Sequence, residues 1–401
     1  MYATSRSRGE PIMKVKTAFS HLHATVERYD ALSANDVEAW RNLCRAHQDY
    51  DSALLTPEFA HVISGVRDDV RIIRIHDRDD LKAVLPVHLR PNGYARPLGM
   101  PFSDYSGPVI AEGFPLTIKD TLALAGIAAF SSSAVPDPWR CLHTGAKAAA
   151  EGIEIDSHII RISDQNPDDL YENQRSAHAK RFKNFRRLRN QLEREAGVPV
   201  FDWGRPDEQT LETLLQFKSA QFRQSGYVDL TNATKAREIL DAVARSPYSF
   251  MTSLRVGGTL ISGHFGVRVG NAFHPWIAAF NPAFAHFSPG NVLLMSVLEH
   301  MRDMGLRVYD LANGHDHYKK YFSNDHRTAR PVFETGSGLQ ALQHRASRMA
   351  WKLAGADTPS STTGRLQRRL DQIAVSEFGA FSRLKEFAYA LKTRSIPPKG
   401  N

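Results

Sequence analysis

The strongest constraint in this sequence is a repeated order of predicted elements. Each half reads as two helices, a hairpin, a further strand, a helix and a last strand, because helical spacing gives way to β-rich runs in the same steps. The helix starts at Thr56 and Thr234 are separated by the same offset as the hairpin turns at Asp79 and Gly257. The halves therefore align without a gap across these elements, which favours duplication of an α/β unit.

The elements follow from apolar spacing, caps and turn residues. The first half is predicted to contain helices over Asp36–Ala46, from Thr56, and over Leu116–Phe130, with strands over Val70–Ile75, Ala83–Leu89 and Trp139–His143. The second half is predicted to contain helices over Glu212–Phe222, Thr234–Ala244 and Asn291–Met304, with strands over Phe250–Val256, Leu260–Val269, Phe273–Ala279 and Leu306–Leu311. Two more helices are predicted over Leu339–Ala354 and Ser376–Leu391.

Length and composition exclude several classes of protein. A chain of 401 residues suits two or three domains, and 42% hydrophobic residues are enough to bury a core in each half. The longest uncharged apolar stretch, Thr121–Phe130, is far shorter than the roughly 20 residues that cross a bilayer. The N-terminus lacks the apolar run of a secretory signal, so we expect a cytoplasmic protein. Cys44 and Cys141 have no metal-site spacing and are expected to be buried.

The chain is basic, with a formal net charge of +8, so its partners are expected to be anionic. The excess lies in two stretches, Arg175–Arg194 and Arg345–Lys399, and neither carries a recognisable nucleic-acid motif. The first stretch reads as a helix held by its apolar side. Its position between the halves also allows Arg181 or Arg187 to bind a sugar nucleotide or a lipid-linked phosphate.

The first motif with chemical meaning is Ser288-Pro289-Gly290, between a predicted strand and helix. A helix N-terminus preceded by glycine presents backbone N–H groups and the positive end of the helix dipole, which suits a phosphate. The alternative is structural: Ser288 caps the helix, Pro289 starts it, and Gly290 allows tight packing.

The second motif follows the strand that ends near Asp310. His315, Tyr318 and Lys319 belong to a run of polar and titratable residues at the C-terminal edge of the predicted sheet, where ligands bind in α/β folds. Such residues suit proton transfer and anion binding. A zinc site would need a further ligand that the sequence does not identify, so no metal is expected. A polar surface loop is the alternative.

These two motifs together resemble a known family. Ser288-Pro289-Gly290, an amphipathic helix, and the pattern Asp-x-x-x-Gly-x-x-x-Tyr-Lys from Asp310 to Lys319 are similar to CelD/BcsL-type acetyltransferases of exopolysaccharide and cellulose biosynthesis. That family belongs to the GNAT superfamily and is related to the Fem-type aminoacyltransferases, which carry two GNAT-like units. The resemblance implies an α/β (α+β) fold of tandem GNAT-like units, with mixed, mostly antiparallel sheets flanked by helices and a helical C-terminal tail.

The resemblance also implies a donor and a site. Acetyl-CoA or another acyl-CoA would be the donor, with pantetheine between two splayed strands and pyrophosphate on the helix N-terminus. Ser288, Gly290, Asn291 and Lys319 would bind this cofactor. The first half reads Glu112-Gly113-Phe114-Pro115 where the second has its Ser-Pro-Gly motif, so its own cofactor site is expected to be lost.

Acyl transfer needs a base for the nucleophile and a proton donor for the departing thiolate. We expect Tyr318 to be the donor and one of His264, His315 or Asp310 to be the base. A buried core histidine is the alternative for His264. Asp104 and Tyr105 lie in a segment similar to one that lines the cleft of the family, although an ordinary strand-to-loop turn explains it equally well.

The predicted organisation is a flexible tail over 1–25, a first unit over 26–165, a catalytic second unit over 166–338 and a basic helical extension over 339–401. The predicted function is transfer of an acyl group from coenzyme A to an amine or hydroxyl of a sugar or cell-envelope precursor. A Fem-type transferase that uses aminoacyl-tRNA and a non-catalytic scaffold of polysaccharide synthesis are the alternatives. The basic terminal helices could pack on the core, mediate assembly with a polysaccharide synthesis machinery, or lie on an anionic membrane.

Overall fold

The computed structural model describes residues 21–142, 155–162, 170–225, 229–313 and 318–356, with a few more between 361 and 370. The first repeat comprises β1 (Leu22–Glu27), α1 (Ala34–Arg45), α2 (Pro57–Ser64), β2 (Val70–Asp77), β3 (Asp80–Leu89), β4 (Tyr94–Pro97), β5 (Val109–Ile110), α3 (Ile118–Ala125), β6 (Ala129–Pro136) and β7 (Ile155–Arg161). The second comprises α5 (Leu170–Ala177), α6 (Ala179–Ala196), β8 (Val200–Gly204), α7 (Glu208–Gln224), α8 (Thr234–Arg245), β9 (Ser249–Val256), β10 (Thr259–Val269), β11 (Ala272–Phe280), the 3-10 helix η5 (Pro282–Phe287), α9 (Pro289–His300), β12 (Val308–Asp310), α10 (Lys319–Phe322) and β13 (Asp325–Thr335). The helix α11 (Leu339–Leu353) follows.

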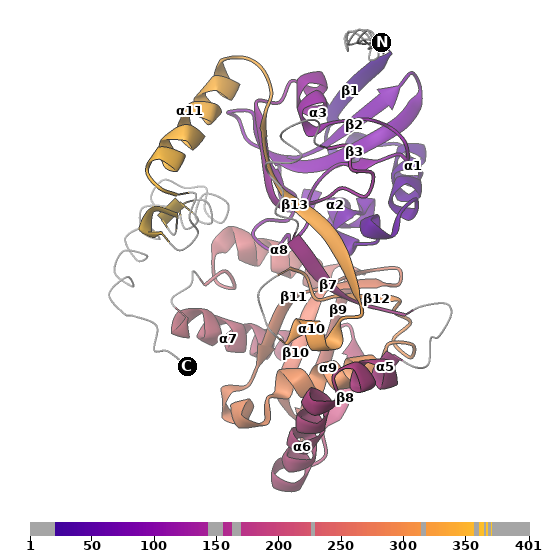
Figure 1. The fold of residues 1–401 in the computed structure, drawn as a ribbon, viewed down its shortest axis with the longest axis vertical. Coiled ribbons are helices and arrows are strands. Elements are labelled where there is room, and N and C mark those ends of the chain that lie inside the picture. The colour runs from indigo at the N-terminus through magenta and orange to yellow at the C-terminus, as the bar shows by residue number, and fades with distance from the viewer. Residues whose placement is uncertain are drawn as a thin grey trace, which may run out of the picture.

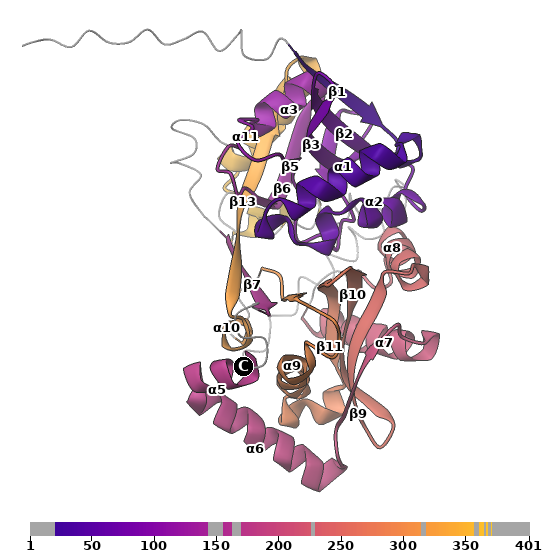
Figure 2. The same cartoon turned by 90° about the vertical axis from the view of Figure 1, so that its right-hand side faces the viewer.

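The element order confirms the repeat. Each half contains a strand, two helices, three strands, a crossover helix and two further strands. The first half adds the short strand β5, and the second adds the helices α5, α6, η5 and α10. The two repeats lie one above the other (Figures 1 and 2). The strand before the paired helices, β1 in the first repeat and β8 in the second, was not predicted from the sequence pattern. The predicted start of α2 is confirmed in detail, because the Thr56 hydroxyl accepts from the Phe59 N–H at 3.3 Å and Pro57 occupies the first turn.

One sheet runs through both repeats in the order β1-β2-β3-β4-β6-β13-β7-β12-β11-β10-β9-β8, with β5 paired to β3. Neighbours are antiparallel except β4 with β6 and β11 with β12, where a helix crosses over between parallel strands. The last strands have changed places: β13 pairs with β6, β7 pairs with β12, and the two pair with each other at the junction (Figure 1). The predicted α/β class is confirmed, while the unit boundaries at 165 and 338 stay predictions.

Two predictions around the first crossover helix are wrong. The helix predicted over Leu116–Phe130 spans only Ile118–Ala125, because Gly126 takes a left-handed conformation with φ of 66° and ends it. Phe130 lies in β6 instead. The strand predicted over Trp139–His143 is absent from the described residues 139–142, which form turns, and His143 lies outside the described residues. The strand β6, which begins at Ala129, was not predicted because its small residues have low β-propensity.

The largest apolar cluster takes side chains from both repeats. Phe59 of α2 lies in it with Leu214 of α7 and Ile239 of α8. Trp276 of β11 packs edge-on against Phe59 and stacks on Phe102. Burying one such side chain contributes about 1.5–3 kcal/mol, so separating the repeats would be costly. Separate clusters lie beneath α3 in the first repeat and beneath α9 in the second.

Candidate functional site

The strands β11 and β12 part soon after they begin to pair. Their parallel ladder consists of Ala272 with Val308 and Phe273 with Tyr309. On its other side β11 has a bulge, because Phe265 and Gly266 of β10 pair with Ile277 and Pro275 and leave Trp276 between them. Gly266 is required there, since a Cβ atom would lie 2.0 Å from the His274 carbonyl oxygen. The ladder between the two strands ends at Phe273 and Tyr309, although β11 continues to Phe280 in the direction of η5 and α9.

The N-terminus of α9 is open. Ser288 has a left-handed φ of 52° and its side chain makes no capping hydrogen bond, while Pro289 occupies the first turn. The amides of Asn291 and Val292 donate to the Ser288 carbonyl at 3.0 and 3.3 Å. A Cβ atom on Gly290 would have nothing within 4 Å. This geometry contradicts the structural alternative of a serine cap with tight packing at Gly290, and it leaves room for an anion at the positive end of the helix dipole.

A chain of buried polar groups lies beside the end of this ladder. The ring nitrogen Nδ1 of His264 lies 2.8 Å from the Tyr309 hydroxyl, which lies 2.9 Å from the Thr252 hydroxyl. Burial and the nearby Lys218 and Lys319 lower the pKa of His264 to about 3, so its imidazole is neutral at physiological pH. Both strands β9 and β10 thus supply side chains to the α9 side of the sheet.

Two lysines hold the backbone of β11 and of the segment after β12. The Nζ of Lys218, on α7, donates to the Ala278 carbonyl of β11 at 3.1 Å. The Nζ of Lys319, on α10, donates to the Asn313 carbonyl after β12 at 2.9 Å, and Lys319 is buried. Tyr318 packs half-buried against the apolar cluster beneath α9. Predicted residues Gly314 and His315 lie outside the described residues.

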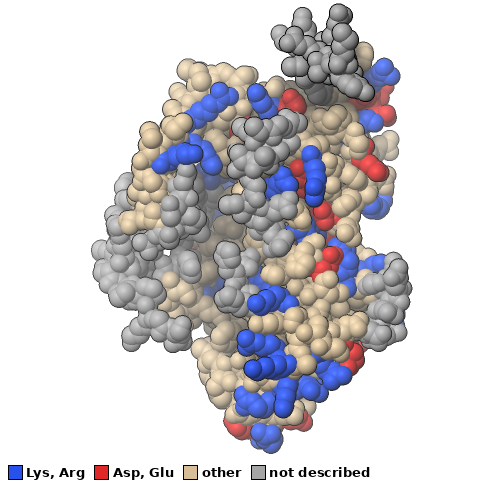
Figure 3. Space-filling model, viewed as in Figure 1, with Lys and Arg blue, Asp and Glu red and all other residues tan. Residues whose placement is uncertain are grey.

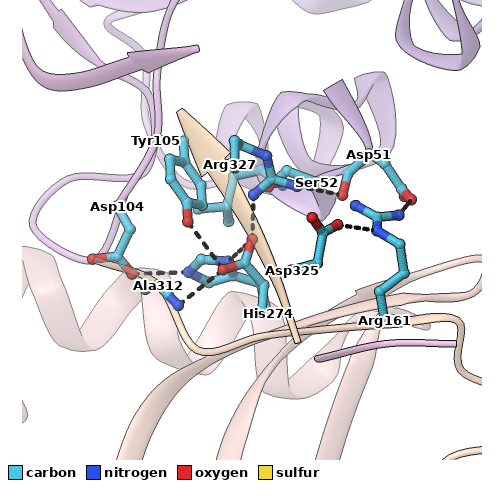
Figure 4. Close-up of polar contacts among 11 residues, drawn as sticks. Asp51, Ser52, Asp104, Tyr105, Arg161, His274, Ala312, Asp325 and Arg327 are labelled. Atoms are coloured by element: carbon cyan, nitrogen blue, oxygen red, sulfur yellow. Dashed lines mark hydrogen bonds and ion pairs between the residues drawn. The ribbon is translucent and has the colours of Figure 1, made fainter. Parts of the chain in front are cut away.

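Asp310, at the end of β12, contacts residues of both repeats. Figure 4 shows several of its partners, among them Tyr105, His274 and Arg327. Its Oδ1 accepts from the Tyr105 hydroxyl at 3.0 Å and from the Ala312 N–H at 2.8 Å. Its Oδ2 forms an ion pair with Arg327 Nη1. Burial raises the pKa of this carboxyl, but Arg327 and His274 outweigh burial and hold the pKa well below its ordinary value. Asp310 is therefore a carboxylate whose acceptor positions are largely used.

His274 bridges the repeats on the other side of the same carboxylate. Its Nε2 lies 2.8 Å from Asp104 Oδ2, and its Nδ1 lies 3.5 Å from Asp310 Oδ2, an ion pair too long for a good hydrogen bond. Burial lowers the pKa of His274, yet the two carboxylates outweigh it and raise the pKa to about 9. A buried imidazolium thus joins one carboxylate from each repeat.

Arginines complete this junction. Arg327 of β13 is fully buried, lies 4.7 Å from the Tyr105 ring centre, and donates from Nη2 to the Asp51 carbonyl at 2.7 Å. Arg161 of β7 pairs with Asp51 at 2.9 Å and with Asp325 of β13 at 2.5 Å (Figure 4). The exchanged strands β7 and β13 therefore bring the cations to acids of both repeats.

The other predicted binding residues lie elsewhere. Arg181 stands 5.0 Å from the Tyr321 ring centre, and Arg187 donates to Asn184 and Gln191. Both arginines are exposed on α6, where lysine and arginine side chains gather in the lower part of Figure 3. The structure thus brings Tyr105 to Asp310 and links Asp104 to Asp310 through His274. It leaves Arg181 and Arg187 on a cationic helix face.

A cavity of about 610 Å³ lies between the two repeats, near the start of β11. It is lined by α1, the turns around Tyr50 and Asp51, and the β10–β11 turn at Gly270 and Asn271. The open N-terminus of α9 lies beyond the opposite end of β11. Within the described ranges no group of three His, Cys, Asp or Glu side chains could hold a metal ion, and no helix is long and apolar enough to span a bilayer.

Sequence reasoning missed Lys218, His274 and Arg327. None belongs to a motif, and each obtains its partner through the sheet register or through contact between the repeats. One signal was present for Arg327: it is a charged residue within a run that forms the long strand β13. A charge flanked by strand residues suggests a buried pair, but the partner cannot be read from the sequence.

Comparisons with known proteins agree with the fold of the second repeat. The profile of the acetyltransferase (GNAT) domain family matches residues 179–320. A comparison with curated protein sequences finds no significant match. Similar solved structures include FemX, with 12% identity and a TM-score of 0.49 over 77% of this chain and 98% of that chain. A tandem GNAT protein from the clavulanic acid biosynthesis pathway has 10% identity and a TM-score of 0.41 over 78% and 98%.

A third similar structure is the C-terminal domain of a protein proposed to be a lysylphosphatidylglycerol synthetase, from Agrobacterium fabrum, with 13% identity and a TM-score of 0.45 over 79% and 96%. At these scores the assignment rests on the profile match and on the residues described above. The match lies on the half that carries the open helix and the strands β11 and β12. The expectation of an acyltransferase is confirmed at the level of this domain, because residues 179–320 match the acetyltransferase (GNAT) domain family.

Proposed function

We propose that this chain transfers an acetyl or other acyl group from coenzyme A to an amine or hydroxyl of a sugar or cell-envelope precursor, as CelD/BcsL-type enzymes of exopolysaccharide synthesis would. The observation that carries the proposal is the uncapped N-terminus of α9 beside strands that part after Phe273. The acceptor class rests on the resemblance described above. We place the reaction in the cytoplasm, where the donor is made.

The residues present fit such a donor. The backbone N–H of Gly290 would donate to the pyrophosphate, with Ser288 and Asn291 beside it, because the helix dipole favours an anion there and no side chain caps this helix end. Lys319 would attract a phosphate or an acidic acceptor. When bound, coenzyme A supplies the activated thioester, and this chain supplies the orientation and the proton transfers.

The chemistry requires one bond to form and one to break. The acceptor nitrogen or oxygen adds to the thioester carbonyl and loses its proton, and the carbon–sulfur bond then breaks as the thiolate gains a proton. We assign Tyr318 as the proton donor, and His264 or His315 as the base. His264 is neutral and has a low pKa, so it would be a weak base.

We assign Asp310 a positioning role. Tyr105, Ala312 and Arg327 use its acceptor positions, which leaves little capacity to take a proton from the acceptor. Through His274 and Tyr105 this carboxylate fixes the first repeat, with Asp104, against the end of β12. The first repeat would thereby form one wall of the acceptor site, and Arg181 or Arg187 on α6 would attract an anionic acceptor.

The rival is an aminoacyl-tRNA-dependent transferase, and one observation favours it. The face of α6 exposes Lys180, Lys183 and Arg186 beside Arg181 and Arg187, which would suit the phosphates of an RNA. Mixing the protein with acetyl-CoA or with charged tRNA, and measuring transfer from each, separates the two donors.

Calorimetric titration with acetyl-CoA tests the proposal. We expect saturable binding by the natural chain and a loss of roughly 100-fold or more in the Gly290→Trp variant, whose indole would fill the space in front of α9. Lys119→Trp is the matched control, because Lys119 is exposed at the equivalent position of α3. Equal binding by both variants, or no binding of acetyl-CoA and longer acyl thioesters, would reject the α9 site.

A further inference from the structure

The helix α11 carries an apolar stripe that faces away from the protein. Leu339, Leu342, Met349 and Leu353 are 73, 57, 57 and 81% exposed, although large apolar side chains are usually buried. With Ala346, which is also exposed, their spacing is three and four residues in alternation, so they form one line along the helix. In Figure 1 α11 lies on the outer side of the first repeat.

The opposite side of α11 is docked by polar contacts. His344 lies 3.1 Å from the Asn92 carbonyl, and Arg345 donates to Thr335 Oγ1 at 2.5 Å and to the Gly336 carbonyl at 3.0 Å. Arg348 stands 4.3 Å from the centre of the Phe333 ring. An amphipathic helix normally buries its apolar side. This helix holds the protein with its polar side, so its apolar stripe is presented to a partner.

The charge around the stripe identifies that partner. Arg345, Arg348 and Lys352 lie along one border of the stripe, and the first two also make the contacts that dock α11. Residues 336–356 contain no Asp or Glu. In Figure 3, Lys and Arg side chains gather at the upper left, where Figure 1 places α11, and again in the lower part of the same face, over α6. A second copy of α11 would bring cations against cations with no acid to pair them. Residues 371–401 of the same chain hold five Lys or Arg and three Asp or Glu, so they too carry a net positive charge.

An anionic lipid surface would interact with both the exposed apolar stripe and the cations beside it. Apolar side chains on one line enter the boundary between headgroups and acyl chains, while the flanking cations pair with headgroup phosphates. We infer that α11 is a membrane-docking helix that attaches this protein peripherally to bilayers rich in anionic phospholipid. The inference is independent of the acyl-transfer reaction, because no residue of the site around Asp310 or α9 takes part.

Flotation of the purified full-length protein with vesicles tests the inference. We expect binding to vesicles of phosphatidylcholine mixed with phosphatidylglycerol, little binding to phosphatidylcholine alone, and weakening as salt rises. The variant L339Q/L342Q/M349Q/L353Q should lower the partition coefficient roughly 100-fold, since it removes the apolar contribution. The control V26Q/V198Q/V200Q changes exposed apolar residues on β1 and near β8 and should bind as the natural chain does.

A second pair of variants isolates the charge. R348Q/K352Q should weaken binding to anionic vesicles several-fold, whereas R78Q/R245Q, which removes two exposed cations elsewhere, should not. Failure of the natural chain to bind anionic vesicles, or equal binding by the quadruple variant, overturns the inference.

Two further measurements exclude the other occupants. Sedimentation velocity should show the same oligomeric state for the natural chain and the quadruple variant, because the stripe does not join two copies. The melting temperature of the quadruple variant should not fall, because its side chains are exposed. Dissociation of a dimer would identify a second copy, and a fall of several degrees would identify the chain's own C-terminal residues as the cover; either outcome overturns the membrane assignment.

Discussion

The two repeats begin their crossover helices in opposite ways. In the first, the Thr117 hydroxyl accepts from the Asp120 N–H at 3.0 Å and the Asp120 carboxylate accepts from the Thr117 N–H at 3.3 Å, so a reciprocal cap closes α3. In the second, Ser288 makes no side-chain cap and the space before Gly290 is empty. The same fold thus carries one closed and one open helix N-terminus.

This difference suggests that the second repeat binds the donor and that the first repeat has a structural role. In a capped helix a side chain already accepts a hydrogen bond from a backbone N–H of the first turn, and a carboxylate such as Asp120 would also repel a phosphate. An uncapped helix leaves the positive end of its dipole available to an anionic ligand. The closed repeat instead sends Asp51, Asp104 and Tyr105 into the junction. In the proposed division of labour, the second repeat binds the donor and the first completes the wall around it.

The largest expected effect breaks the link between the repeats. Arg327→Met would leave the Asp310 carboxylate buried without its arginine, and such losses cost about 3–5 kcal/mol. Urea denaturation should show a corresponding fall in the free energy of unfolding. Arg45→Met, which removes an ion pair whose arginine side chain is 64% exposed, should cost about 0.5 kcal/mol or less. Equal losses in the two variants would show that the junction does not hold the repeats together.

The second prediction concerns pH. The folded pKa of His274 is about 9, above the ordinary value of 6.5, so protonation stabilises the folded state. That contribution is complete below pH 6.5 and is lost as pH rises to 9, a decrease of up to about 3 kcal/mol in the free energy of unfolding. Chemical denaturation across this window measures it. The variant His274→Gln should be less stable at pH 6.5 and flatter across the window; a slope unchanged from the natural chain would assign the pH dependence to other groups.

The third prediction separates chemistry from donor binding within the second repeat. Tyr318→Phe should lower turnover about 100-fold and leave the affinity for acetyl-CoA unchanged, because it removes a proton donor and keeps the ring. Release of free thiol and calorimetry report the two quantities. A variant with full turnover would remove Tyr318 from the mechanism.

The smallest expected effect is on the free energy of unfolding when the N-terminal residues of α3 and α9 are changed. Thr117→Ala should lower the free energy of unfolding by about 1 kcal/mol, since it removes the cap of α3. Ser288→Ala should change it by only a few tenths, since the Ser288 side chain caps nothing. Thermal denaturation of both variants provides the measurement, and a larger loss for Ser288→Ala would reverse the contrast between the repeats.

Local signals predicted much of this fold. The Thr56 cap with Pro57, the hairpin at Asp79 and the helix after Gly290 all appear where the sequence indicated them, because each depends on residues close in the chain. The first crossover helix was predicted too long, since the left-handed role of Gly126 and the small residues of β6 gave a weak signal. The exchange of β7 and β13 between the repeats could not be predicted from the sequence, because it depends on contacts between distant segments.

The site divides in the same way. Ser288-Pro289-Gly290 is local, so its open helix end could be anticipated. Asp104 and Tyr105 were predicted to line the cleft from the resemblance alone, with an ordinary turn as the alternative, and their role in the cleft stays a prediction. The packing of the two repeats places Tyr105 against Asp310 and Asp104 against His274. His274 and Arg327 could not be found, because only the register of β11 and β13 places them against carboxylates. Whether these residues act in catalysis stays a prediction.

The placement of β13 has a consequence for folding during synthesis on the ribosome. Its pairing partner β6 belongs to the first repeat, yet β13 is synthesised only after nearly the whole second repeat. As the chain leaves the ribosome, the first repeat emerges with a bare strand edge that has no native neighbour to receive it. Until the last strand arrives, that edge is open to strands of other nascent chains, so the time taken to translate the second repeat sets the period of greatest exposure to aggregation.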